Sequence, residues 1–317
     1  ERIMQTETVK LTKENRQRTL DRAVRIIKSG GLVVFPTETV YGLGANAEDQ
    51  QAVKKIFIAK GRPSDNPIIV HIATLEQLSK LTDHISSLEQ KLIDIFWPGP
   101  LTIIFQKNKN VPDVVSGGLD TVAARMPSHP FAHDLILSAG VPIAAPSANL
   151  SGRPSGTTGE HIFVDLEGRV NMIINAGSSD IGLESTVVRV NKNNISILRP
   201  GAVTHEMLER FAPVSFASDK KELQSSPGTR YRHYAPKAKL EILKSRDALG
   251  KRLKDLREKN MKVGVLPKRN LKKASKNLYH DLRALDAQGV EIILCESFPE
   301  KGLGVALMDR LKRAAKK

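Results

Sequence analysis

The 317-residue chain contains one cysteine, few aromatic residues and no long apolar run. A single thiol, Cys295, cannot form a disulfide within the chain, so a disulfide-stabilised scaffold is excluded. No apolar stretch approaches the roughly 20 residues that a membrane-spanning helix needs. The first ten residues are mixed and polar, and they resemble neither a signal peptide nor a transit peptide. We therefore expect a cytoplasmic globular protein that does not engage a membrane.

Acidic residues are scarce relative to basic ones. The sequence has 34 Asp and Glu against 49 Lys and Arg, which gives a formal net charge of +15. An excess of this size suggests nucleic-acid binding, so its position along the chain matters. Residues 237–317 hold 22 Lys and Arg against 10 Asp and Glu, a net charge of +12, whereas residues 1–236 carry only +3. The excess therefore belongs to the last quarter of the chain.

The length predicts about two domains, because single cores rarely grow beyond about 250–300 residues. In residues 1–211 short β-rich runs alternate with helical periodicity, which predicts an α/β domain built on a mixed, twisted sheet. Residues 212–236 are rich in Ser, Pro and Gly and are predicted to form a linker. Residues 237–317 alternate three strands with three helices, expected over 246–258, 273–288 and 304–315. This order predicts a small Rossmann-like domain with a parallel sheet.

Sequence motifs of several familiar enzyme classes are missing. There is no GxxxxGK[ST] phosphate loop, no GxSxG, no HExxH and no cysteine cluster. His129 and His133 lie four residues apart on an expected helix, but no third ligand is near them in the sequence. We therefore interpret them as ordinary helix residues and predict no metal site built from side chains. Cys295 ends an apolar strand and is expected to be a buried small hydrophobe.

Polar loops that follow predicted strands are what the sequence offers instead. The loop at 35–47 contains Thr37 and two glycines, and the loop at 145–158 contains Ser147 and Asn149. Taken singly, such loops are typical of turns, because Gly, Pro, Ser and Asn favour turns for backbone reasons. Their hydroxyl and amide groups, together with accessible backbone N–H groups, could also surround a ligand.

Four basic side chains stand at the ends of apolar elements: Lys60, Arg62, Arg125 and Arg199. A cation near a core needs a partner, and a bound polyanion would supply one. Phosphates bind Lys as a compact point charge and Arg through two parallel hydrogen bonds from its planar guanidinium group. Arg125 in particular ends a strand, where open α/β sheets bind their ligands. The pattern predicts a site that binds and orients reactants and stabilises phosphoryl charge.

Seven stretches of the sequence carry a resemblance to a known family. They read PTETVYGLG, KGRPSDNPIIVHI, WPGPLT, ARMPSHP, PSANLSGRPSGTT, STVV and LRPGAV, and in this order they resemble the YrdC family. The continuation from SPGTRYRHYAPKAKLEIL to GLGVALMDRLKRAA is similar to its long, two-domain form. The resemblance implies a nucleotidyltransferase that converts L-threonine, bicarbonate and ATP into threonylcarbamoyl-AMP and pyrophosphate. It also implies Mg²⁺ held mainly by phosphates and water.

The reaction implied by the resemblance is the first step of threonylcarbamoyladenosine modification of tRNA. Its product would pass to a tRNA threonylcarbamoyl transferase complex.

The resemblance also implies roles for individual residues. The KxR and SxN signatures, expected to be catalytic, fall on Lys60, Arg62, Ser147 and Asn149. L-Threonine would be held by Thr37, His71, Arg125, Ala145 and Ser185, with Arg125 forking the carboxylate. ATP would contact Lys60, Ser64, Thr121, Ser147, Ser155, Arg199 and Tyr234. The linker, through Tyr231, Arg232, His233 and Tyr234, would fold over the nucleotide as a lid.

An RNA-binding module without ATP chemistry is the alternative. The family fold is associated with a basic concave surface, and RNA-binding proteins often carry a high positive charge. Two features weigh against it: the part of the chain that carries the motifs has a net charge of only +3, and aromatic residues total 4%. The basic helices after residue 237 fit either a solvated face or a tRNA contact.

Overall fold

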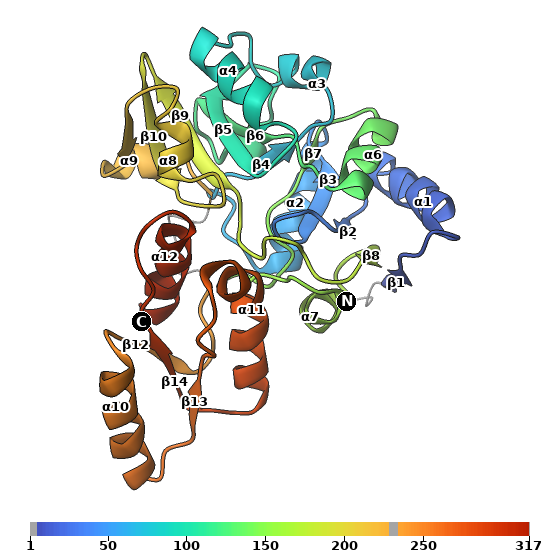
Figure 1. The fold of residues 1–317 in the computed structure, drawn as a ribbon. Helices are drawn as coiled ribbons and strands as arrows, with labels where there is room; N and C mark the ends of the chain where they lie inside the picture. The colour runs from blue at the N-terminus through green and yellow to red at the C-terminus, as the bar shows by residue number, and fades with distance from the viewer. Residues whose placement is uncertain (1–4, 228–233, 317) are drawn as a thin grey trace.

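The structure is a computed structural model that describes residues 5–227 and 234–316, which form two sheets surrounded by helices (Figure 1). The strands of the large sheet are β1 (Glu7–Lys10), β2 (Val33–Phe35), β3 (Gly42–Asn46), β4 (Ile69–His71), β5 (Leu101–Gln106), β6 (Thr121–Arg125), β7 (Ile143–Ala144), β8 (Met172–Asn175), β9 (Thr186–Asn191), β10 (Asn194–Arg199) and β11 (Val214–Phe216). The helices between them are α1 (Arg16–Lys28), α2 (Gln50–Lys60), α3 (Leu75–Ser79), α4 (Ser87–Phe96), α5 (Asp113–Ser116), α6 (Pro130–Ala139), α7 (Gly159–Leu166), α8 (His205–Leu208) and α9 (Lys220–Gln224).

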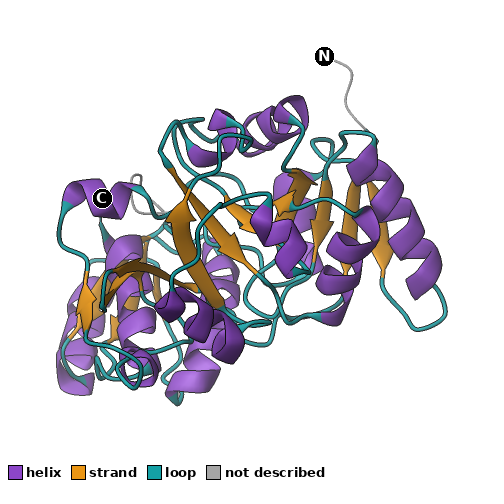
Figure 2. Cartoon of the chain, turned by 90° about the horizontal axis from the view of Figure 1, so that it is seen from above, coloured by secondary structure: helices purple, strands orange, loops and turns teal. Residues whose placement is uncertain are grey.

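The large sheet mixes parallel and antiparallel pairs, in the order β1-β8-β2-β3-β7-β4-β6-β5-β9-β10-β11. Helices lie on both sides of the strands (Figure 2). β4 and β6 are parallel neighbours, and their register places His71 opposite Arg125. Both residues end their strands, so they meet at one edge of the sheet. The predicted mixed α/β architecture is confirmed.

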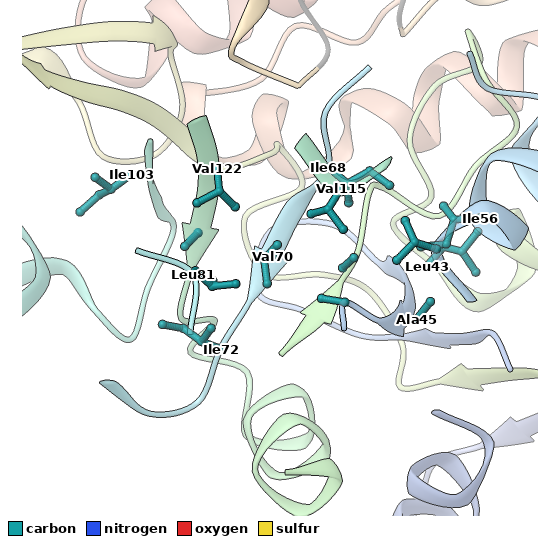
Figure 3. Packing of buried hydrophobic residues seen from close by; sticks show 14 of the residues in the cluster. Leu43, Ala45, Ile56, Ile68, Val70, Ile72, Leu81, Ile103, Val115 and Val122 are labelled. Atoms are coloured by element: carbon teal, nitrogen blue, oxygen red, sulfur yellow. The ribbon is translucent and has the colours of Figure 1, made fainter. Parts of the chain in front are cut away.

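The main core joins α2 to the strands beside it. Leu43, Ile56, Val70 and Val122 are each 2% exposed or less and belong to one apolar cluster, and Figure 3 shows Ile56 of α2 beside Leu43 of β3. Helix α2 begins at Asp49, whose side chain accepts hydrogen bonds from two backbone N–H groups of the first turn. It ends at Gly61, which has a φ of +60° and is therefore suited to the left-handed C-cap. This end of the helix fixes Lys60 and Arg62.

The small sheet consists of β12 (Lys239–Leu243), β13 (Val263–Val265) and β14 (Ile292–Glu296), all parallel, with β14 in the centre. Its helices are α10 (Arg246–Glu258), α11 (Leu271–Ala287) and α12 (Leu303–Ala315). α10 packs on one face through Leu256, while α11 and α12 cover the other face. Cys295 is 2% exposed within β14, as expected for a small apolar side chain. The predicted Rossmann-like parallel sheet is confirmed.

Two segments of the chain differ from the expectations. Residues 42–46, within the segment 35–47 predicted as a loop, form β3. A Cβ on Gly44 would lie 2.7 Å from the Phe35 ring, so this position of the strand needs glycine. Because glycine is not typical of strands, the sequence pattern did not indicate one here. The predicted linker, residues 212–236, contains β11 and α9. Division of the chain at residues 211 and 237 stays a prediction. In the described parts of the chain, no helix has the length and apolarity required to cross a bilayer.

Gly182 marks a close approach between the two parts of the chain. It has a φ of +77°, and a Cβ there would lie 2.4 Å from the backbone oxygen of Lys276 in α11. Gly140 has a similar φ of +71°, but a Cβ there would meet nothing within 4 Å. A substitution at either glycine strains the backbone, but only a substitution at Gly182 also crowds the contact with α11.

We predict that Gly140→Ala lowers the free energy of unfolding by about 1–2 kcal/mol, the cost of a left-handed alanine. Gly182→Ala should lower it by about 1–3 kcal/mol more, because the added methyl overpacks the contact with α11. Denaturant unfolding of both variants measures the difference. Equal losses would contradict the close approach.

Candidate functional site

A buried pocket lies at the edge of the large sheet where β4, β6 and β10 end. Its free volume is about 50 Å³, room for a few water molecules. The predicted site residues among those lining it are Thr37, Arg62, His71, Arg125, Ala145, Ser147, Ser185, Arg199 and Tyr234. These residues are far apart in the sequence, and the fold brings them together.

Five further predicted residues do not line this pocket: Lys60, Ser64, Thr121, Asn149 and Ser155. Lys60, Asn149 and Ser155 are buried, and each has a hydrogen bond to a residue that does line it. Ser64 is exposed, in the turn after α2. Thr121 begins β6, at the strand end opposite to Arg125. Tyr231, Arg232 and His233 lie outside the described residues.

Lys60 organises the loop that contains Ser147 and Asn149. Its Nζ donates hydrogen bonds to the backbone oxygens of Ser147 at 2.5 Å and Asn149 at 2.6 Å. The Ser147 hydroxyl donates to Asn149 Oδ1 at 2.6 Å. Burial, and secondarily the charge of Arg62, lowers the pKa of Lys60 well below its ordinary value. Lys60 of the KxR signature thus forms one hydrogen-bonded cluster with Ser147 and Asn149 of the SxN signature.

Arg62 and Arg199 bring positive charge to the pocket and are held by neutral oxygens. Arg62 Nη2 donates to the backbone oxygen of Pro67 at 2.8 Å, and within residues 5–227 and 234–316 its buried Nε has no acceptor. Arg199 donates from Nε to the Ser185 backbone at 3.0 Å and from Nη2 to the Ser185 hydroxyl at 3.0 Å. Burial lowers the pKa of Arg62 to about 10, so it is still charged at neutral pH. Buried cations whose printed hydrogen bonds go to neutral oxygens suit an anionic ligand.

Arg125 is paired with Glu38, a residue that the sequence reasoning missed. Its Nη2 donates to Glu38 Oε1 at 2.5 Å, and its Nη1 donates to the Thr39 hydroxyl at 2.9 Å. Burial alone would raise the pKa of Glu38, but the charge and hydrogen bond of Arg125 lower it overall. A buried arginine needs a carboxylate partner, and Glu38 stands directly after Thr37 in a loop already considered as part of the site. This was the signal that could have indicated Glu38.

Glu184 is the second carboxylate at the pocket that the sequence reasoning missed. It is 5% exposed and lines the pocket next to Ser185. Its Oε1 accepts a hydrogen bond from the Ser155 hydroxyl at 2.5 Å. Its other partners come from α11 and α12 of the small domain.

The hydroxyl groups in the pocket are tied to the surrounding framework. Thr37 donates to the backbone oxygen of Val40 at 2.5 Å, and Ser185 shares a hydrogen bond with the Thr102 hydroxyl at 2.7 Å. His71 packs edge-on against Phe35, and its buried Nδ1 has no hydrogen-bond partner among the residues that the structure describes. Since His71 lines the pocket, its ring offers a polar group that could contact a ligand.

Side chains that could hold a metal do not gather in the described parts of the chain: no group of three or more His, Cys, Asp or Glu occurs there. His129 has a different role, because its Nδ1 accepts a hydrogen bond from the Phe131 backbone N–H and caps α6.

Comparisons with known proteins identify the family. The model of the Sua5, YciO and YrdC proteins, described as "Telomere recombination", matches residues 25–201. A second model, described as "Threonylcarbamoyl-AMP synthase, C-terminal domain", matches residues 203–316. The threonylcarbamoyl-AMP synthase of Pyrococcus abyssi is 43% identical over 92% of this chain and 93% of its own. That of Bacillus subtilis is 43% identical over 93% of this chain and 92% of its own.

The chain belongs to the threonylcarbamoyl-AMP synthase family. Solved structures agree with this assignment along the whole chain. Sua5 of Pyrococcus abyssi in complex with L-threonine is 41% identical, with a TM-score of 0.89 over 99% of this chain and 97% of that one. A doubly substituted form of the same protein has a TM-score of 0.92, with 40% identity over 98% and 96% of the two chains. The resemblance to the two-domain YrdC proteins and the prediction of an adenylyl-transferring enzyme are confirmed.

The pKa of His71 tests the electrostatics of the pocket. Burial, and then the charge of Arg125, lowers the pKa of His71 to about 3. We predict that its NMR signals show no titration between pH 8 and pH 5. An unfolded histidine takes up a proton near pH 6.5. Because the folded ring does not, His71 should make the protein less stable as the pH falls from about 6.5 toward 3. A midpoint near 6.5 in the folded protein would contradict this burial.

Proposed function

We propose that this chain condenses L-threonine, bicarbonate and ATP into threonylcarbamoyl-AMP, with release of pyrophosphate, in the pocket at the edge of the large sheet. One observation carries the proposal: three buried guanidinium groups, those of Arg62, Arg125 and Arg199, line a single pocket. A carboxylate and a triphosphate are the anions that such a set would bind. Membership of the family supplies the identity of the two substrates.

Arg125 is proposed to bind the threonine carboxylate. Glu38 already occupies its Nη2, so the substrate carboxylate must compete with a protein carboxylate for the same group. Thr37 and Ser185 would offer hydroxyl groups to the bound threonine. His71 would offer a ring nitrogen, and Ala145 would offer its backbone. This competition favours ligands with a strong planar acceptor, since Arg binds carboxylates as a two-pronged fork.

Arg62, Arg199 and the Lys60–Ser147–Asn149 cluster are proposed to hold the phosphates of ATP. Ser64, Thr121, Ser155 and Tyr234 are proposed as further contacts to the nucleotide. A free volume of about 50 Å³ is far below the 300–1,000 Å³ that small-molecule sites usually have. ATP can therefore enter only if the pocket widens. Tyr234, one of the residues proposed as a lid, lines the pocket, and so does Pro227.

The chemistry proposed needs orientation and charge stabilisation more than a protein nucleophile. The threonine amine and bicarbonate form a carbamate, with water as the second product. A carbamate oxygen then forms a bond to the α-phosphorus while the bond from that phosphorus to the pyrophosphate oxygen breaks. Two anions meet in this step, so fixed cations lower its barrier. Lys60, Arg62 and Arg199 would supply them.

Mg²⁺ is proposed to enter with the triphosphate and to neutralise part of its charge. The donor set fits this mode of binding, because Mg²⁺ in nucleotide sites takes most of its ligands from phosphates and water. Glu184, the carboxylate that lines the pocket, already accepts hydrogen bonds from Ser155, Tyr279 and Arg310. The protein would therefore contribute few ligands of its own.

The product is proposed to pass to a tRNA threonylcarbamoyl transferase complex. Direct contact with tRNA through the basic small domain is a weaker proposal, supported only by its net charge of +12.

The reaction can be tested by omission. Pyrophosphate release by the full chain with Mg²⁺ should require threonine, bicarbonate and ATP together, because the attacking carbamate forms from the first two. Pyrophosphate release that is indifferent to threonine would contradict the proposed function.

Arg125→Ala tests the threonine site. We expect at least a roughly 30-fold loss of threonine affinity, since removing one member of a buried charge pair costs about 2–5 kcal/mol. ATP binding should survive, because Arg62 and Arg199 remain. Calorimetric titration of each substrate measures both effects.

Two controls accompany this variant. Glu38→Gln together with Arg125→Ala removes the carboxylate that would otherwise stay buried and unpaired, and should still fail to bind threonine. Arg22→Ala, on α1 and away from the pocket, should bind threonine normally. Unchanged threonine affinity in Arg125→Ala would refute the assignment of Arg125.

A further inference from the structure

One carboxylate joins the pocket to the small domain. Glu184 accepts hydrogen bonds from the Ser155 hydroxyl at 2.5 Å, from the Tyr279 hydroxyl at 2.8 Å and from Arg310 Nε at 2.8 Å. Ser155 belongs to the loop at 145–158 of the large domain, which also contains Ser147. Tyr279 belongs to α11 and Arg310 to α12. Tyr279 and Arg310 are completely buried, so this contact is shielded from water and salt.

Arg310 also contacts Pro200 and Tyr234, which lie at or next to the pocket. Its Nη2 donates to the backbone oxygen of Pro200, directly after Arg199, at 3.0 Å. Its guanidinium carbon lies 5.2 Å from the centre of the Tyr234 ring, a cation–π distance. The Tyr234 ring in turn stacks on Tyr279, with ring centres 5.7 Å apart. Two residues of the small domain, Arg310 and Tyr279, thus contact the ring of Tyr234, a side chain that lines the pocket.

The groups around Glu184 and Arg310 keep both of these side chains charged. Burial alone would raise the pKa of Glu184, but the nearby charges of Arg310 and then Arg199 lower it overall. Burial alone would lower the pKa of Arg310, but its neighbours Tyr234 and Glu184 raise it overall. Both groups are therefore charged. Because Arg310 provides the direct ion pair, the hydrogen bonds of Arg199 go to neutral oxygens of Ser185 and Pro227.

We infer that Arg310 and Tyr279 are positioning residues for the nucleotide: they hold Glu184 on the small domain, and thereby leave Arg199 free to bind the phosphates of ATP. The inference rests on the proposed function. If Arg310 lost its charge, Glu184 would be a buried, unpaired anion beside Arg199. It would then compete with the phosphates for that guanidinium. Threonine binding, which relies on Arg125, would be little affected.

Arg310→Met tests this inference, with steady-state kinetics of pyrophosphate release as the readout. We expect the KM for ATP to rise at least tenfold, while the KM for threonine stays within about twofold, because only the nucleotide side loses a cation. Adding Glu184→Gln should then lower the KM for ATP again by at least threefold, since it removes the competing negative charge. A purely structural ion pair predicts recovery of thermal stability in the double variant without recovery of the KM for ATP.

Two further variants keep the test decisive. Glu206→Ala removes a different polar contact between the domains, the acceptor of the Gly302 backbone N–H at 3.1 Å, and should leave both KM values unchanged. If Arg310→Met does not fold, Tyr279→Phe removes only one hydroxyl from Glu184 and should raise the KM for ATP about threefold, with no change for threonine.

The outcomes separate the inference from the proposed function. Absence of threonine-dependent pyrophosphate release by the unchanged protein would refute the proposed function. An active protein whose Arg310→Met and Tyr279→Phe variants keep the original KM for ATP would overturn the inference alone. So would a double variant whose stability recovers while its KM for ATP does not.

Discussion

The structure depends on the burial of four cations at one edge of a sheet. Lys60, Arg62, Arg125 and Arg199 are all 9% exposed or less. Removing such charges from water costs several kcal/mol each unless partners replace the lost hydration. The loops after the strands supply those partners, mainly as backbone oxygens, and Lys60 alone binds two of them. The shape of the pocket follows from this requirement.

Two buried carboxylates near the pocket each form an ion pair with an arginine. Glu38 pairs with Arg125 inside the large domain, where a substrate carboxylate would take its place. Glu184 pairs with Arg310 of the small domain, which leaves Arg199 to neutral partners. The two arginines of the pocket therefore differ: Arg125 has an ion-pair partner, whereas the hydrogen bonds of Arg199 go to neutral oxygens. Under the inference drawn above, the small domain would affect the chemistry through the Glu184–Arg310 pair.

Much of this arrangement can be predicted from sequence, because it depends on local patterns. α10 runs over residues 246–258 as predicted, and the apolar run that ends at Arg125 is a strand. β3 was missed because glycines replace the β-branched residues that mark strands. Glu38 and Glu184 were missed because their partners are far away in the chain; Arg310 is 126 residues from Glu184. Roles for Ser64 and Thr121 came from the family resemblance, and neither residue lines the pocket.

The central claim is that the buried cations form a site for a polyphosphate. Calorimetric titration of the protein with ATP and with adenosine tests it most directly. Each charge-assisted hydrogen bond to a phosphate is worth about 1.5–3 kcal/mol, so ATP should bind at least about 100-fold more tightly than adenosine. Equal affinity for ATP and adenosine would contradict the account.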